Sequence, residues 1–298
     1  PAMTVDEARQ SAIEAISEIN RGRNPNDTEK EVRNRNFTVE RVFHAYIADR
    51  GKKLSSNTVS NYKGLLNKHL KDWKTKQLSS ITRDLVASKH SAISKESESA
   101  ANKTMRVLRA LFNYANGAYE SADGKSLFPD NPVKRLTHTR SWNREERRDN
   151  TIKRSQLKPW FKAVMGLSCS DDEFDRTVGD YLQFVLLTGL RRREAASLRI
   201  SDVDFKERSF TVFVTKNRQP LSLPMSDYTG KLLKRRCDES ASDYVFSGPG
   251  KSGRLDDPRR LINHIREFSG VDFTIHDLRR TFITLAESLD ISAYALKR

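Results

Sequence analysis

The chain of 298 residues carries 54 Lys and Arg against 39 Asp and Glu, a formal net charge of +15. Charged residues make up 31% of it, and no apolar run reaches the roughly 18 residues that a membrane span needs. The composition therefore argues against a membrane protein, and the length favours two domains. A basic excess of this size indicates a nucleic acid as the partner.

The N-terminal sequence and the cysteines bear on the cellular location of the protein and on its need for a metal. No signal-peptide pattern opens the chain, and Cys169 and Cys237 have no metal-ligand spacing with histidine. We expect a cytoplasmic protein that uses neither a cofactor nor a metal.

Residues 4–20 have apolar side chains at helical spacing, and Gly22 and Pro25 follow in a region that breaks helices. The segment 1–30 is too short to form a domain. It is interpreted as the tail of an upstream segment or as a simple N-terminal helix.

Residues 36–121 show an apolar period close to 3.6, which predicts a bundle of four helices. Thr38, Ser55 or Ser56, and Thr82 are candidate N-caps. Residues 31–150 hold 24 basic and 13 acidic side chains, a net charge of +11. A lysine-rich helix face is usually only solvated, but this excess favours contacts with a DNA backbone. The candidate lysines surround the second helix: Lys52, Lys53, Lys63, Lys68, Lys71 and Lys74.

Residues 122–150 contain Asp-Gly and Pro-Asp-Asn-Pro and end in a nearly all-polar stretch, so we interpret them as a linker with a domain boundary at 141–150. Beyond it, Ser155 is a candidate cap for the next helix, and 171–188 reads as a long buried helix. After Arg191 the period shifts towards two, which predicts two or three antiparallel strands before helices resume at 226–238, 256–268 and 276. The expected fold is mainly α with a small antiparallel β-sheet.

Three stretches carry candidate chemistry. Arg191 lies one helical turn before Glu194, Lys216 lies at the tip of the predicted hairpin, and His276 lies three residues before Arg279 at a helix start. Fixed guanidinium groups can stabilise the charge that a phosphodiester gains in its transition state, and lysine and histidine can move protons. The set indicates phosphoryl transfer without a metal. Alternatively, Arg191 could only pair with Glu194, and Lys216 could be an ordinary turn lysine.

These motifs, in the order Thr188-Gly-Leu-Arg-Arg-Arg-Glu194, Lys216 and His276-Asp-Leu-Arg279, resemble the tyrosine recombinases of the phage integrase type. Asn131-Pro-Val-Lys134 resembles the end of that family's core-binding domain. The resemblance implies a remnant of an arm-type domain or a linker helix at 1–30, a helical DNA core-binding domain at 31–140, and a mixed α+β catalytic domain at 151–298.

The resemblance also implies roles for the candidate residues. Arg191 and Arg279 would hold the scissile phosphate, Lys216 would protonate the leaving 5′ oxygen, and His276 would assist proton transfer with the attacking tyrosine. Glu194 would orient the site, whereas Arg192 and Arg193 fall outside the catalytic match. The family's nucleophile lies further beyond the second arginine than this sequence extends, and Tyr294 has the spacing of a packing residue. We therefore expect this chain to bind DNA without cleaving it.

The implied activity is site-specific recombination through a 3′-phosphotyrosine, without metal or ATP. The implied partners are double-stranded DNA and further copies of the chain, as a tetramer on DNA, with accessory DNA-bending proteins as a further option and no membrane. Two alternatives stay open: a type IB topoisomerase-like enzyme, which uses similar residues, and a non-catalytic DNA-binding regulator.

Overall fold

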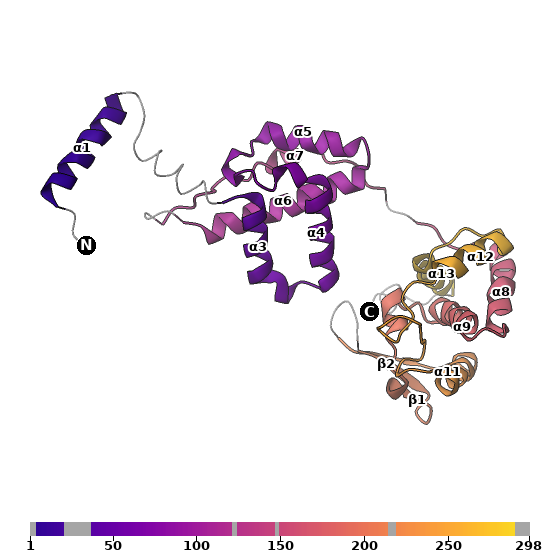
Figure 1. The fold of residues 1–298 in the computed structure, drawn as a ribbon. Coiled ribbons are helices and arrows are strands. Elements are labelled where there is room, and N and C mark those ends of the chain that lie inside the picture. The colour runs from indigo at the N-terminus through magenta and orange to yellow at the C-terminus, as the bar shows by residue number, and fades with distance from the viewer. Residues whose placement is uncertain (1–3, 21–36, 121–123, 147–148, 214–218, 290–298) are drawn as a thin grey trace. The chain divides into compact units, whose positions relative to one another are not determined.

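The computed structural model describes residues 4–20, 37–120, 124–146, 149–213 and 219–289, and Figure 1 shows their helices and strands. The chain divides into two compact units, residues 1–146 and 147–298. The described part is mostly helical with one small antiparallel sheet, so the expected fold class is confirmed. None of the described helices has the length and apolar character needed to cross a membrane.

The first unit is built from four main helices, whose bounds follow from their caps. The hydroxyl groups of Thr38, Ser55, Thr82 and Ser97 each accept a hydrogen bond from the backbone N–H three residues later. Of the two candidates for the second cap, Ser55 is the one used. Apolar faces of these helices meet in one core that includes Val42, Leu70, Val86 and Leu108. The helices are α3 (Val39–Arg50), α4 (Ser56–His69), α5 (Arg83–Ser94) and α6 (Glu98–Ala118).

Part of the predicted linker belongs to the packed structure of the first unit, so that interpretation was wrong for residues 124–143. Phe128, Val133 and Leu136 are buried in the core of the helical unit, and α7 covers Lys134–His138. Asn131 is also buried, and its amide donates to the carbonyl of Arg109 at 3.0 Å and to Asn113 Oδ1 at 2.8 Å. The polar composition of this segment gives no sign of its packing, which depends on a few buried apolar side chains and on one buried asparagine whose amide group is hydrogen-bonded.

Before these four helices in the sequence, α1 covers Val5–Asn20, as the apolar spacing predicts. Its side chains Ile13, Ile16 and Ile19 are exposed.

The second unit packs helices around α9 and carries the sheet. Three short antiparallel strands lie in the order β1-β2-β3, with Val203 opposite Phe210 and Val212 opposite Leu221. The prediction that Ser155 caps the first helix of this unit was wrong, because α8 begins at Arg154 and Lys153 holds the N-cap position. The elements are α8 (Arg154–Ser168), α9 (Glu173–Thr188), α10 (Arg192–Ala196), β1 (Val203–Asp204), β2 (Ser209–Val212), β3 (Leu221–Pro224), α11 (Asp227–Glu239), α12 (Arg259–Ser269) and α13 (Ile275–Glu287).

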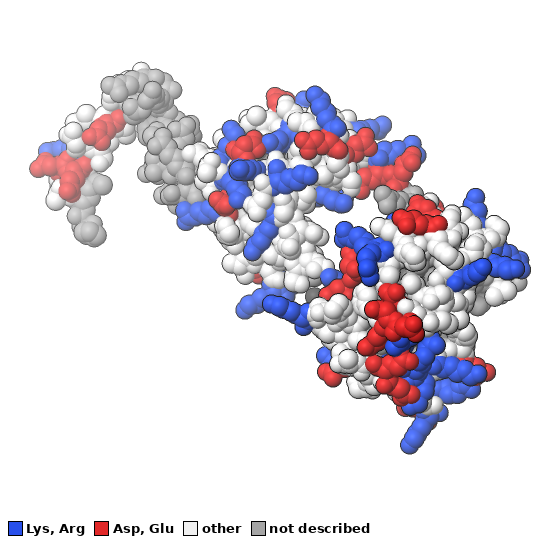
Figure 2. Space-filling model, turned by 45° about the vertical axis from the view of Figure 1, so that its right-hand side comes forward, with Lys and Arg blue, Asp and Glu red and all other residues white. Residues whose placement is uncertain are grey.

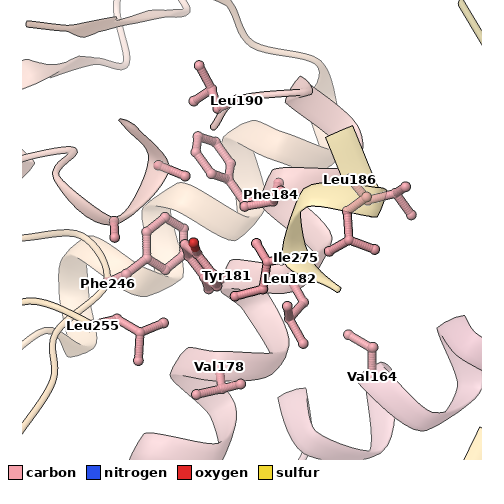
Figure 3. Packing of buried hydrophobic residues seen from close by; sticks show 14 of the residues in the cluster. Val164, Val178, Tyr181, Leu182, Phe184, Leu186, Leu190, Phe246, Leu255 and Ile275 are labelled. Atoms are coloured by element: carbon pink, nitrogen blue, oxygen red, sulfur yellow. The ribbon is translucent and has the colours of Figure 1, made fainter. Parts of the chain in front are cut away.

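The buried helix α9 forms the centre of this unit and ends next to the candidate site. Tyr181, Phe184 and Leu190 pack with Phe246 and their neighbours in the cluster of Figure 3. Gly189 ends α9 with a φ of 64°, and a Cβ there would lie 2.2 Å from a ring atom of Phe282 on α13. Glycine is therefore required where the chain turns towards Arg191.

A buried ionic cluster joins α9 to α11 on the same unit. Asp180 and Arg236 are almost fully buried, and Arg236 Nε lies 2.9 Å from Asp180 Oδ2, at ion-pair distance although not in hydrogen-bond geometry. Arg235 also pairs with Asp180, and Arg236 further pairs with Glu239 and donates to Thr177 Oγ1 at 2.7 Å. Burial raises the pKa of Asp180, although both arginines act in the opposite direction.

Candidate active site

Arg191 is held at the start of α10 by a glutamate. Its backbone N–H donates to Glu194 Oε2 at 2.9 Å, and its guanidinium donates to Glu194 Oε1 at 2.7 Å. The Glu194 side chain is only 4% exposed, whereas that of Arg191 is 34% exposed. Arg191 therefore does form the ion pair with Glu194 that the sequence suggested as an alternative role. This pair leaves the outer edge of the guanidinium open to a ligand.

Arg279 reaches the same place from α13, 90 residues later in the chain. Its Nη1 donates a hydrogen bond to the carbonyl oxygen of Gly189, at the C-terminal end of α9. Phe282, one turn further along α13, packs against Gly189 and sets how closely the two helices approach. The αL turn at Gly189 thus positions both arginines: it leads directly to Arg191 and offers its carbonyl to Arg279.

The two arginines share one electrostatic environment. Burial lowers the pKa of Arg279, the positive charge of Arg191 lowers it further, and Glu194 acts in the opposite direction. Two guanidinium groups with one buried carboxylate leave a local excess of positive charge. Such a site favours an anion with several oxygens, of which a phosphate is the best match to the guanidinium fork.

His276 completes the described part of the cluster. It is the second residue of α13, one turn before Arg279, and its side chain is exposed. Burial lowers its pKa, and the positive charges of Arg280, Arg279 and Arg191 lower it as well, against a raising effect of Asp277. The neutral imidazole can accept a proton from an attacking hydroxyl group or donate a hydrogen bond to a phosphate.

Asp277 fixes the first turn of α13, although the sequence interpretation gave it no role. It is buried, and its Oδ2 accepts from the backbone N–H of Thr274 at 2.9 Å and from the Thr274 hydroxyl at 2.7 Å. Its Oδ1 accepts from Arg280 at 2.9 Å. The capping-box spacing of Thr274 and Asp277 was the signal in the sequence that could have identified it.

We predict that His276 is uncharged at neutral pH in the DNA-free protein. The lowered pKa means that the unfolded chain binds the proton more readily, so this group makes folding less favourable as the pH falls through its ordinary value of 6.5. Imidazole NMR should place its titration midpoint below that value, and Arg280→Gln should raise the midpoint by removing the positive charge that lowers the pKa most. A midpoint at or above that of a solvated histidine would refute the assignment.

Of the residues considered for the reaction, Lys216 and Tyr294 lie outside the described residues. Of the neighbouring arginines, Arg192 and Arg193 are exposed, and Arg192 donates to the carbonyl of Asp256 at 2.7 Å.

The six candidate DNA-binding lysines differ in their surroundings. Lys52, Lys53, Lys63, Lys68 and Lys71 are exposed. Lys74 is half-buried and pairs with Glu40 at 3.0 Å, so its charge is already partly compensated. Further basic side chains lie in separate patches on the visible face of the helical unit in Figure 2, with acidic ones between them. The sequence interpretation did not single out Lys103 and Arg106, which line a groove beside α4; their spacing of three on α6 was the available signal.

Comparison with known proteins decides the family. Residues 150–291 match the phage integrase family, and residues 42–117 match the N-terminal SAM-like domain of phage integrases. The chain belongs to the tyrosine recombinase family. Prophage integrase IntF of Escherichia coli is 31% identical over 222 residues, which are 72% of this chain and 45% of IntF. The chain thus spans less than half the length of this relative.

Other family members support the same assignment. Tyrosine recombinase XerA of Pyrococcus furiosus is 26% identical over 261 residues, 84% of this chain and 80% of XerA. Two solved structures have the same fold. A λ integrase fragment (residues 75–356), solved as a dimer bound to a COC′ core site, has a TM-score of 0.67 at 17% identity and covers 88% of this chain and 93% of its own. The Tn1549 transposon integrase, solved with a circular intermediate DNA, has a TM-score of 0.69 at 17% identity and covers 88% and 90%.

Proposed function

We propose that this chain forms the core-DNA-binding and catalytic parts of a site-specific DNA recombinase. The observation that carries the proposal is the convergence of Arg191, Arg279 and His276 beside the end of α9. Within the described residues, no group of three or more His, Cys, Asp or Glu side chains could hold a metal ion. The arginines themselves are the groups that can stabilise the charge of a reacting phosphodiester.

In the proposed reaction, a tyrosine hydroxyl attacks a DNA phosphodiester while Arg191 and Arg279 hold its non-bridging oxygens. A 3′-phosphotyrosine forms and the 5′ oxygen leaves, taking a proton from Lys216. His276 accepts the proton of the attacking hydroxyl, and Glu194 keeps Arg191 in place. The hydroxyl of a second strand then reverses the step, so the energy of the broken bond is retained and no ATP is consumed.

We further propose that residues 31–140 bind the duplex through their basic face, that the chain beyond residue 146 leads into a catalytic domain at 151–298, and that several copies assemble on DNA as a tetramer. The candidate lysines would neutralise phosphates, so binding should weaken steeply with salt. λ integrase, which has a similar fold, has been solved as a dimer bound to a core site and as a tetramer bound to a Holliday junction, and these assemblies support the proposed arrangement.

We predict that the 298-residue chain binds duplex DNA without forming a covalent adduct. The second unit has three described tyrosines, Tyr181, Tyr228 and Tyr244, and among its described residues no hydrogen bond or ring contact links any of them to Arg191 or Arg279. Tyr181, on the helix that leads to the site, is buried and donates its hydroxyl hydrogen to the carbonyl of Arg192 at 2.8 Å. A nicked suicide substrate tests this: binding appears as a mobility shift, and an adduct would survive denaturation.

An adduct would overturn the prediction, and peptide mapping would show whether Tyr294 carries it. Absence of any mobility shift would overturn the proposed DNA binding itself. In a recombinase that contains the attacking tyrosine, exchange between two sites distinguishes recombination from mere relaxation of supercoils.

A further inference from the structure

A basic groove of about 560 Å³ lies on the first unit between α4 and α6. Asn61 and Lys68 line it from α4, and Lys103 and Arg106 line it from α6, with the ring of Tyr62 beside them. Lys103 and Arg106 are exposed, three residues apart on one face of α6. Amide, ammonium and guanidinium donors around an open groove suit the phosphates and sugars of a nucleic acid backbone.

Arg106 also has partners close to the end of the first unit. Its Nη2 lies 3.4 Å from Glu145 Oε1, and its guanidinium lies 6.0 Å from the centre of the Trp142 ring. Both partners belong to the last residues of the first unit, next to its boundary at 146. Arg106 thus lines the groove and also contacts the end of the unit.

The segment 142–145 is fastened to the helical core by a buried polar network. Asn102, buried on α6, accepts from the backbone N–H of Asn143 at 3.2 Å and donates to its carbonyl at 3.0 Å. The same amide donates to Glu145 Oε1 at 2.8 Å, and the Asn143 side chain donates to Ser94 Oγ at 2.7 Å. We call this set of contacts around Asn102, Asn143 and Glu145 the latch.

We propose that a DNA phosphate in the groove and Glu145 compete for Arg106, so that DNA binding to the first unit loosens the latch at its C-terminal end. The inference rests on the proposed function, because it takes duplex DNA as the ligand. Glu145 Oε1 accepts a hydrogen bond from Asn102 and forms an ion pair with Arg106, so withdrawal of Arg106 removes the cation that holds this carboxylate in the latch.

The energies make such an exchange feasible. The Arg106 side chain is 59% exposed and that of Glu145 is 35% exposed, so their pair is a weak surface pair. A phosphate can accept two hydrogen bonds from the guanidinium fork and releases counterions when Arg106 neutralises it. Arg106 therefore binds the phosphate in preference to Glu145. The free energy that couples DNA binding to the latch is small enough for the exchange to be reversible.

Four proteins test the competition by their affinity for one duplex: wild type, Arg106→Gln, Glu145→Gln, and the double variant. Glu145→Gln keeps an oxygen for Asn102 but removes the competing charge, so we expect about two- to five-fold tighter binding when Arg106 is present. Arg106→Gln should weaken binding and reduce the slope of log K against log salt by about 1. In the Arg106→Gln background, Glu145→Gln should change affinity by no more than the control does.

Glu146→Gln is the matched control, because it removes an equal charge at the next position and leaves Oε1 of Glu145 in place. It should act equally with or without Arg106. If Glu145→Gln behaves the same way, or if Arg106→Gln binds like the wild type, the competition is refuted while the proposed DNA binding stands. No binding by the wild type refutes the proposed function first.

Hydrogen exchange provides the second readout. The amide of Asn143 is inside the latch, and DNA should speed its exchange about two- to five-fold in the wild type. Coupling is reciprocal, so DNA should weaken the Arg106–Glu145 pair by the same factor by which that pair weakens DNA binding. In Arg106→Gln, DNA should leave it unchanged. Equal effects of DNA on both proteins, or slower exchange in the wild type, would overturn the coupling.

Discussion

Replacing Arg279 by alanine is expected to slow DNA strand cleavage by about 10²–10³-fold in a recombinase that contains the attacking tyrosine. The guanidinium is preorganised, because it donates to the carbonyl of Gly189 and shares its environment with Arg191. Its charge is therefore in place before the phosphodiester gains negative charge in the transition state. The rate is measured on a nicked suicide substrate at saturating protein, so that weaker binding does not reduce it.

Arg193→Ala is the matched control, because Arg193 is an exposed arginine two residues after Arg191. It should leave cleavage within a few-fold of the wild type. Arg279→Lys separates charge from geometry: it keeps a cation but cannot reproduce the planar fork, so it should recover only part of the rate. An alanine variant that is folded and cleaves within five-fold of the wild type would remove Arg279 from the proposed mechanism.

The helices and their ends could be predicted because local chemistry determines them. Thr38 and Thr82 cap the helices that they were expected to cap, and the apolar period placed α9 and α13 within one or two residues. The two-residue period likewise predicted the small sheet. Each of these signals lies within a few residues of the feature that it predicts.

Composition and periodicity could not predict the packing of segment 124–143, because its signals are long-range, and only the family resemblance assigned residues up to 140 to the helical domain. Its polar composition is typical of a linker, but Phe128 and Leu136 fill space left by helices that lie elsewhere in the sequence. Asn131 donates to a carbonyl 22 residues away. Periodicity detects an element with its own apolar face and not a segment that supplies single side chains to a core.

The candidate site was predicted through the order of its motifs and not through its geometry. The spacing of Arg191 and Glu194 indicated a contact one turn apart, and the contact is present. The contact between Arg279 and the Gly189 carbonyl spans 90 residues, so it depends on how α13 packs against α9. The pairing of Arg106 with Glu145 depends in the same way on the folded path of residues 142–146.

Replacing Asp180 by alanine is expected to destabilise the second unit by about 3–5 kcal/mol. The carboxylate is fully buried beside Arg236, whose side chain is 1% exposed. Burial raises the pKa of Asp180, whereas Arg235 and Arg236 act in the opposite direction. Removing one member of a buried ion pair leaves the other charge uncompensated. The loss therefore comes mainly from leaving Arg236 buried without this partner, and only to a lesser degree from the pair itself.

Urea unfolding measures the effect in a background in which Trp73 and Trp142 are phenylalanine, so that the fluorescence comes from Trp160, which is buried in the second unit. Asp238→Asn is the control: it removes a carboxylate of α11 whose pair with Lys234 is exposed, and should cost less than about 1 kcal/mol. If desolvation dominates, the double variant Asp180→Ala with Arg236→Met should regain most of the lost stability, because no buried charge is then left in excess. A double variant as unstable as Asp180→Ala would mean instead that the ionic contacts themselves hold α11 against α9, and that the end of α9 at Gly189 depends on them for its position.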